Sequence, residues 1–179
     1  MVTTHNAPTA PFGGDKRAII AHQFGRWTAF SAIRSGKHVK SGDRVYPALD
    51  AVPFTPLFDG GAITLDEFDR WHENAVSVMC QSVSPTRNER FNVSHAAKVI
   101  AVYLKTVCFL SGYGRPGLVE AISPPFDRAL MKELSLKDNT FPEEHDHDDH
   151  MERVKVARRE AVKRKCLPIE LEALWRPDA

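Results

Sequence analysis

Residues 94–110 read SHAAKVIAVYLKTVCFL, and this stretch decides the fold that the sequence predicts. On a helical wheel, at about 100° per residue, almost every side chain of the stretch is apolar. The polar exceptions share one narrow line or lie beside it: Ser94, Lys98, Lys105, His95 and Thr106. A helix of this kind is buried on most of its circumference and needs neighbours on several sides. We therefore expect it at the centre of the domain, with Lys98 as one of its few cations.

The second informative stretch is SPPFDRALMKEL, residues 123–134, which follows a connection broken by glycine and proline. Ser123 and the two prolines after it predict the cap and the first two positions of a helix, because proline is tolerated where a helix amide has no partner. Asp127 then lies in the first turn, where the helix dipole favours a carboxylate. In the same way, Ser94 is the expected cap of the central helix.

Hydrophobic spacing predicts further helices before these two stretches. Asp15 is placed to cap a first helix that ends near Ser35. Thr64 and Glu67 form a capping box, with threonine at the cap and glutamate three residues later, and so predict the start of another helix. The inner face of that helix consists of Leu65, Phe68, His72, Ala75, Val76 and Met79.

The remaining segments complete the expected architecture. Residues 145–165 predict a charge-rich, largely solvated helix. Residues 167–175 predict a short amphipathic helix that covers the core with Leu167, Leu171, Leu174 and Trp175. Glycine, proline and aspartate interrupt residues 36–61, which we expect to form a long ordered loop, and residues 1–14 predict a flexible leader. Because no period-two run is present, the prediction is an all-α fold, a single orthogonal helical domain over residues 15–179.

Composition limits the classes of function. The 179 residues carry 24 basic and 23 acidic side chains, a net charge of +1, so no overall field favours nucleic acid or an anionic membrane. The three cysteines are widely spaced and form no CxxC pair, which is typical of reduced thiols. No apolar run predicts a membrane span, and the N-terminal residues lack the features of a signal peptide. We therefore expect a cytoplasmic protein without a membrane partner.

The most conspicuous short motif is HDHDDH, residues 145–150, which matches the H-x-H-x-D-H ligand string of the metallo-β-lactamase fold. That fold needs strands and further ligands downstream, whereas no histidine follows His150. We interpret the motif as the acidic start of a helix that opposes the basic residues at 158–165. The sequence thus predicts no metal site and no cofactor, although adventitious metal binding by His145, His147 and Asp149 stays open.

Lys98 and Asp127 are the pair of residues that fits a chemical role. A lysine that is partly desolvated on a buried helix can have a lowered pKa and act as a nucleophile. An aspartate at the start of the next helix can accept a proton or stabilise a cation. Removal of a base from a nucleoside needs both roles, because the sugar passes through an oxocarbenium-like state. In the structural alternative, Lys98 extends to solvent and Asp127 serves only the helix dipole.

Residues 97–105, AKVIAVYLK, and residues 123–130, SPPFDRAL, resemble the helix-hairpin-helix DNA glycosylases, in particular the 8-oxoguanine DNA glycosylase-like branch. Members of that group carry a catalytic lysine at the start of an apolar helix and a Pro-x-Asp at the start of the next. The resemblance implies a glycosylase-like fold, with Lys98 as the Schiff-base lysine, Asp127 as the catalytic aspartate and DNA as the partner. The chain is also similar to small uncharacterised prokaryotic proteins that end like residues 170–175.

Two features of that family differ in this sequence. The family holds a DNA phosphate on a glycine-rich hairpin before the lysine, whereas residues 90–95 contain no glycine. Lys98 and Asp127 are 29 residues apart (127 minus 98), a longer separation than in the family. We predict that the side chains of Arg87, Arg90 and Lys105 contact the DNA phosphates instead. The alternative is a non-enzymatic helical binding or accessory protein, which the nearly neutral charge favours, and the oligomeric state is left open.

Overall fold

The computed structural model of the protein describes residues 10–33, 39, 41–87, 91–136 and 146–174. In this part of the chain the secondary structure is helical, and the one β-type contact is an isolated bridge between Ala10 and Gly13. The prediction of an all-α fold is therefore confirmed. The α-helices are α1 (Lys16–Ser31), α2 (Gly42–Asp50), α3 (Leu65–Ser82), α4 (Val93–Leu104), α5 (Leu118–Ala121), α6 (Arg128–Glu133) and α7 (His147–Arg164). The other helical segments are the 3-10 helices η1 (Thr55–Leu57) and η3 (Pro168–Leu174) and the π-helix η2 (Lys105–Leu110).

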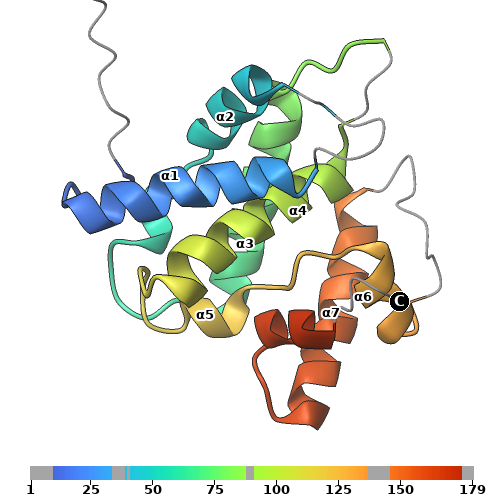
Figure 1. Ribbon diagram of the computed structural model, residues 1–179. Coiled ribbons are helices and arrows are strands. Elements are labelled where there is room, and N and C mark those ends of the chain that lie inside the picture. Colours follow the sequence, from blue (N-terminus) through green and yellow to red (C-terminus); the bar gives the residue numbers. More distant parts are fainter. Residues whose placement is uncertain (1–9, 34–38, 40, 88–90, 137–145, 175–179) are drawn as a thin grey trace, which may run out of the picture.

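The helix α4 is central to the fold and continues directly into η2. Every residue of α4 after its first is buried except Lys98. The helices α1 and α3 pack along α4, and α7 also contacts it (Figure 1). The expected central helix is therefore present, and its last six residues, which include Lys105, form a π-helical turn instead of a continuous α-helix.

Two of the predicted helix caps are present. The carboxylate of Asp15 accepts a hydrogen bond of 2.7 Å from the amide of Ala18 at the start of α1. The hydroxyl of Thr64 accepts one of 3.2 Å from the amide of Glu67 at the start of α3. These short polar contacts fix where the two helices that flank α4 begin.

Two other cap assignments were wrong. The cap of α4 is Asn92, which forms a reciprocal capping box with His95, so Ser94 lies inside the helix. The cap of α6 is Asp127 itself, one position before the helix and not within its first turn. Residues 123–125 lie outside α6, because a residue that directly precedes proline is disfavoured from the helical region.

The predicted long loop over residues 36–61 was also wrong. The described part of it contains the nine-residue helix α2 and the short helix η1. Val45, Ala48 and Leu49 are buried on one side of α2, at the spacing of an amphipathic helix. Pro47 lies inside this helix, so the proline content of the region misled the prediction.

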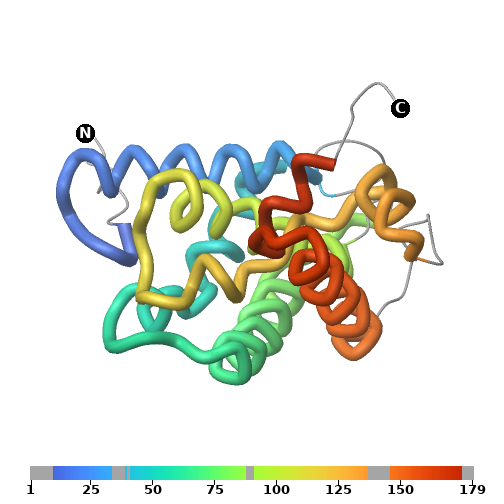
Figure 2. Tube along the Cα trace, turned by 90° about the horizontal axis from the view of Figure 1, so that it is seen from below, coloured from blue at the N-terminus to red at the C-terminus, as the bar shows by residue number. Residues whose placement is uncertain are grey.

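The buried apolar side chains form two clusters. The larger one gathers residues of α1 to α5 with η1 and η2, together with Ile169 of η3. The smaller one lies between α6, α7 and η3, which sit together on one side of the molecule in Figure 2. Its buried members are Phe126, Leu130, Met131, Leu134, Val154, Ala157, Ala161 and Leu171. The helix α7 therefore has a buried face and is not the largely solvated element that its charge predicted, whereas Leu65, expected inside, is 46% exposed.

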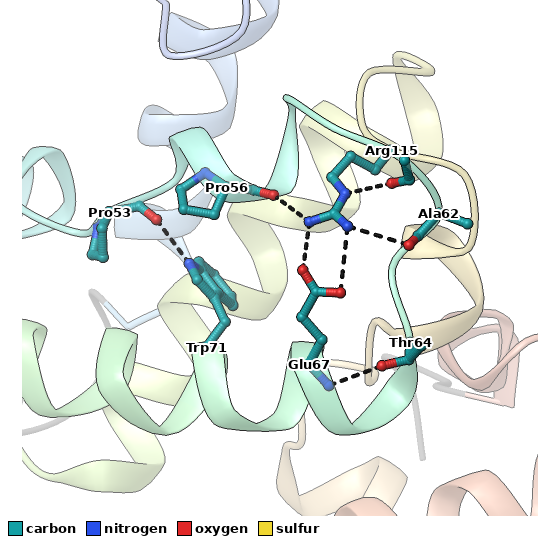
Figure 3. A network of polar contacts seen from close by, with 8 residues as sticks. Pro53, Pro56, Ala62, Thr64, Glu67, Trp71 and Arg115 are labelled. Carbon is teal, nitrogen blue, oxygen red and sulfur yellow. Dashed lines mark hydrogen bonds and ion pairs between the residues drawn. The ribbon is translucent and has the colours of Figure 1, made fainter.

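A network around Arg115 ties the start of α3 to the turn after η2 (Figure 3). The guanidinium donates to both carboxylate oxygens of Glu67, at 2.6 and 3.3 Å. It also donates to the backbone carbonyls of Pro56, Gly61 and Ala62. The side chain of Arg115 is only 11% exposed, so these acceptors replace the water that a cation normally binds.

The end of the expected N-terminal leader is packed against the main cluster. The ring of Phe12 lies 4.7 Å from that of Phe58 and 4.6 Å from that of Tyr113, measured between centroids. Ala10 is buried as well. Residues 1–9 lie outside the described part of the chain.

The segment Val93–Leu110 is long and apolar enough to cross a membrane by length and composition alone. Within the structure 72% of it is buried among the other helices. This burial is the pattern of a core helix, which passes the same test. Length and composition therefore give only weak evidence for a membrane span.

Candidate functional site

A small cavity lies between the two apolar clusters. Its walls come from α3, α4, α7 and the connection between α5 and α6. Most of the lining is apolar, and the polar side chains at its wall are Asp69, His72, Ser94, Lys98, Ser123, His150 and Arg153. Its volume of about 20 Å³ is enough for roughly one water molecule. The cavity therefore combines apolar walls with a few polar groups, as ligand sites do, but its volume is that of a water site.

Lys98 lines this cavity and is partly buried, whereas its neighbours on α4 are buried. Burial lowers the pKa of its amine, because the charged form loses hydration. The carboxylates of Asp127 and Glu172 act in the opposite direction on this pKa, and the charge of Lys105 lowers it. Burial has the largest effect, so the amine is easier to deprotonate than an exposed lysine.

Asp127 is held by the start of α6. Its carboxylate accepts a hydrogen bond of 2.8 Å from the amide of Leu130, which fixes the position of the negative charge. From there the charge acts on Lys98. The fold thus places Asp127 near enough for its charge to raise the pKa of Lys98, although Asp127 itself does not line the cavity.

Glu172 is a second acidic neighbour of Lys98, which the sequence analysis missed. It lies on η3 and forms an ion pair of 2.7 Å with Lys105. Its charge also acts on Lys98. No spacing rule connects η3 with α4, because their proximity depends on how the C-terminal segment folds back. The only signal in the sequence was an acidic residue on an amphipathic segment.

Of the three predicted DNA contacts, the two that the structure describes, Arg87 and Lys105, do not line the cavity. Arg87 is exposed in the connection between α3 and α4 and does not line the cavity. Lys105 is engaged by Glu172. Arg90 lies outside the described residues.

A group of histidines joins α3 to α7, and two of them, His72 and His150, line the cavity. The Nδ1 atom of His72 lies 3.4 Å from the Nε2 atom of His147, and the ring of His72 stacks on that of His150 at 5.1 Å. Burial, followed by the charge of His147, lowers the pKa of His72 to about 3, so its ring is neutral at pH 7. No group of three potential ligands within the described ranges could hold a metal ion. His145, the first histidine of the HDHDDH motif, is outside those ranges.

Two of the three cysteines, Cys80 and Cys108, offer no alternative nucleophile. Burial raises the pKa of the Cys80 thiol to about 11, and it raises the pKa of the buried Cys108 thiol as well. Both groups are therefore protonated and unreactive at neutral pH, as expected for Cys108 from its apolar face.

The run GYGRPG, residues 112–117, matches the G-x-G-x-x-G pattern of dinucleotide-binding loops. Such loops need a strand before them and the N-terminus of a long helix after them. Here the run follows the π-helix η2 and precedes α5, which has four residues. Its glycines serve a turn, and we assign no nucleotide site to it.

No protein-family model matches the chain, and neither a curated protein nor a solved structure matches it. The function has to be inferred from the residues at the cavity.

Proposed function

We propose that this protein is a DNA glycosylase-like enzyme in which Lys98 attacks the sugar carbon of a nucleotide with a damaged base. The single observation that carries the proposal is the position of Lys98, whose amine is partly buried at a cavity and has a pKa lowered by burial. A neutral amine is a nucleophile, and an ammonium ion is not. Asp127, fixed by the start of α6, supplies the negative charge that the reaction needs.

In the proposed reaction the lone pair of Lys98 forms a bond to C1′ while the bond from C1′ to the base breaks. The electron pair of that bond leaves with the base, which takes a proton from water. The amine passes one proton to Asp127, which returns it to the hydroxide left by that water. The sugar ring then opens as the bond from C1′ to O4′ breaks, O4′ takes the second amine proton, and an imine remains between Lys98 and C1′. The charge of Asp127 favours the transition state, because the sugar carbon is then positively charged.

The size of the cavity implies that one wall moves during this reaction. A volume of about 20 Å³ holds a water molecule but no nucleobase. Opening on the side formed by α6, α7 and η3 requires that the ion pairs of Arg158 with Asp69 and of Lys105 with Glu172 break and that Ile169 leaves the main cluster. Lids of this kind close over many active sites.

The second candidate is a non-enzymatic helical binding or accessory protein, and the pairing of the cations favours it. Four basic side chains are neutralised by acidic partners: Arg26 by Asp50, Arg115 by Glu67, Arg158 by Asp69 and Lys105 by Glu172. A protein that binds a DNA duplex usually presents a basic face. Under this alternative, Lys98 takes part only in local electrostatics and Asp127 only caps α6.

Borohydride trapping distinguishes the two candidates. The protein is incubated with oligonucleotides that contain oxidised bases or abasic sites, and the reduced imine is detected as a covalent adduct. The wild type and the surface control Lys163→Ala should form it, because Lys163 is 74% exposed and far along α7, whereas Lys98→Ala should not. If the wild type forms no adduct on any lesion, the lysine mechanism is wrong, and the accessory protein remains.

A further inference from the structure

Ser94 carries a buried hydroxyl that the fold leaves unsatisfied. The residue is 4% exposed, and its Oγ atom has no hydrogen-bond partner within the described part of the chain. It lines the same cavity as Lys98 and precedes it by four residues on α4, so the two side chains share one face of the helix. Because Asn92 caps α4, Ser94 has no capping role.

Such a hydroxyl is unfavourable for stability. A buried polar group without a partner costs about 1–3 kcal/mol, and alanine is also the better helix former. Two other buried hydroxyls on this continuous helix have partners: Thr106 donates to the carbonyl of Val102 at 3.0 Å, and the hydroxyl of Tyr103 lies 2.8 Å from Nδ1 of His22. The Ser94 hydroxyl thus does not stabilise the fold, and its position at the cavity allows it to bind a ligand.

We propose that Ser94 donates a hydrogen bond to the oxygen of a sugar aldehyde that binds beside Lys98, which makes open-chain deoxyribose the ligand class of this cavity. The inference rests on the proposed function and deepens it. The chemistry around Ser94 fits a small polar molecule: the cations Lys98 and Arg153 lie at the wall, and the other lining is mostly apolar. At its volume of about 20 Å³ the cavity has room for roughly one water molecule, which can bind the Ser94 hydroxyl.

The Ser94 hydroxyl assists the addition of the Lys98 amine to the sugar aldehyde. The amine lone pair of Lys98 forms a bond to the aldehyde carbon, and the π electrons move to the oxygen, which becomes negative. Ser94 stabilises that oxygen by donating a hydrogen bond to it, without giving up its proton. The oxygen then leaves as water with both hydrogens of the amine, and a carbon–nitrogen double bond remains. A hydrogen bond to a charged group contributes about 1.5–3 kcal/mol, which corresponds to roughly 10- to 100-fold in rate.

Reductive labelling with a free sugar tests this role. The full chain is incubated with 2-deoxyribose 5-phosphate and cyanoborohydride, and the modified lysines are quantified by peptide mass spectrometry. We expect the wild type to be labelled at Lys98 and Ser94→Ala to be labelled there roughly 10- to 100-fold more slowly. The melting temperature of Ser94→Ala should be unchanged or higher, since the variant loses an unsatisfied hydroxyl.

Ser31→Ala is the matched control. The Ser31 hydroxyl also lacks a hydrogen-bond partner within the described residues, but it lies at the end of α1 and does not line the cavity. Its loss should leave labelling at Lys98 unchanged.

The inference is overturned if Ser94→Ala is labelled at the wild-type rate, if Ser94→Ala melts several degrees lower, or if the wild type is not labelled at Lys98. Because the probe contains neither base nor DNA, labelling at Lys98 together with failed trapping on oligonucleotides would reject the proposed glycosylase and retain the role of Ser94.

Discussion

The ammonium group of Lys105 and the carboxylate of Glu172 form an ion pair of 2.7 Å that joins η2 to η3. Both charges also act on Lys98, since Glu172 raises the pKa of the Lys98 amine and Lys105 lowers it. The C-terminal 3-10 helix therefore contributes to the electrostatic surroundings of a residue on the central helix. Substitutions in this ion pair should therefore change the pKa of the Lys98 amine.

Glu172→Gln should lower the pKa of Lys98 further. The variant removes a carboxylate that favours the charged amine and leaves the charge of Lys105 without this partner. The pH profile of acetylation at Lys98, followed by mass spectrometry, should move to lower pH. Lys105→Met should move it to higher pH, because a neighbouring positive charge is lost. Profiles that coincide with the wild type in both variants would show that this ion pair does not influence Lys98.

Asp127→Asn should separate the charge of Asp127 from its capping role. Asparagine caps a helix about as well as aspartate, whereas Asp127→Ala loses the cap and about 0.5–2 kcal/mol of stability. The asparagine variant should melt close to the wild type but form the borohydride-trapped adduct at least about tenfold more slowly, because acid–base groups typically contribute more than that. Trapping of Asp127→Asn at the wild-type rate would leave Asp127 with a purely structural role.

Arg115→Ala should be strongly destabilising. The variant removes a guanidinium that is 11% exposed and satisfies three backbone carbonyls as well as Glu67. The loss should be about 1–3 kcal/mol, because the variant removes a side chain that is 11% exposed, although water can reach the acceptors that stay behind. Urea unfolding measures it. Arg115→Lys should recover only part of the loss, since an ammonium group cannot reproduce the planar arrangement of donors. An equal stability of Arg115→Ala and the wild type would mean that water replaces the whole network.

The sequence predicted the central helix well because its signal is local. The apolar run of α4 dictates burial on all sides, and the caps at Asp15 and Thr64 depend on residues three positions apart. The prediction failed where one local preference opposed another. In α2 the buried positions Val45, Ala48 and Leu49 outweighed Pro47. Burial of these side chains against the core determined that α2 is a helix, and the strength of that packing cannot be read from the sequence alone.

The candidate site was predicted only in part for a related reason. Lys98 is conspicuous as a cation on an apolar helix, and Asp127 as an acid beside prolines. The other members of the site have no such local signal. Glu172 acts on Lys98 because η3 folds back towards α4. Ser94 was predicted to be the cap of α4, whereas the structure has Asn92 in that position. Contacts of this kind depend on the tertiary fold, which spacing rules along one helix do not describe.

Gly25→Ala should destabilise the contact between α1 and the central helix. A methyl group at Gly25 would lie 3.0 Å from Tyr103 Cδ2 and from Val107 Cγ2, and both of these side chains are fully buried. Overpacking of this kind costs about 1–3 kcal/mol, which exceeds the gain of about 1 kcal/mol that alanine brings to a helix. Gly14→Ala is the control, because nothing lies within 4 Å of its added methyl group. If Gly25→Ala proves more stable than the wild type in thermal unfolding, α1 can move away from α4 without loss.

The buried histidines should make the protein less stable in mild acid. Burial lowers the pKa of His72 to about 3 and that of His22 to about 4, whereas an unfolded histidine titrates near 6.5. Below about pH 6.5 the unfolded chain therefore binds more protons than the folded one. The free energy of unfolding decreases by up to about 2 kcal/mol per histidine as the pH is lowered from 6.5 to 5. Urea unfolding at pH 7 and pH 5 measures the loss in a window where few carboxylates titrate. His72→Phe removes one titrating group while keeping an aromatic ring against His150, so its stability should change less with pH than that of the wild type. An equal pH dependence in the two proteins would mean that the ring of His72 takes up its proton without unfolding, and that the contact between α3 and α7 tolerates the charge.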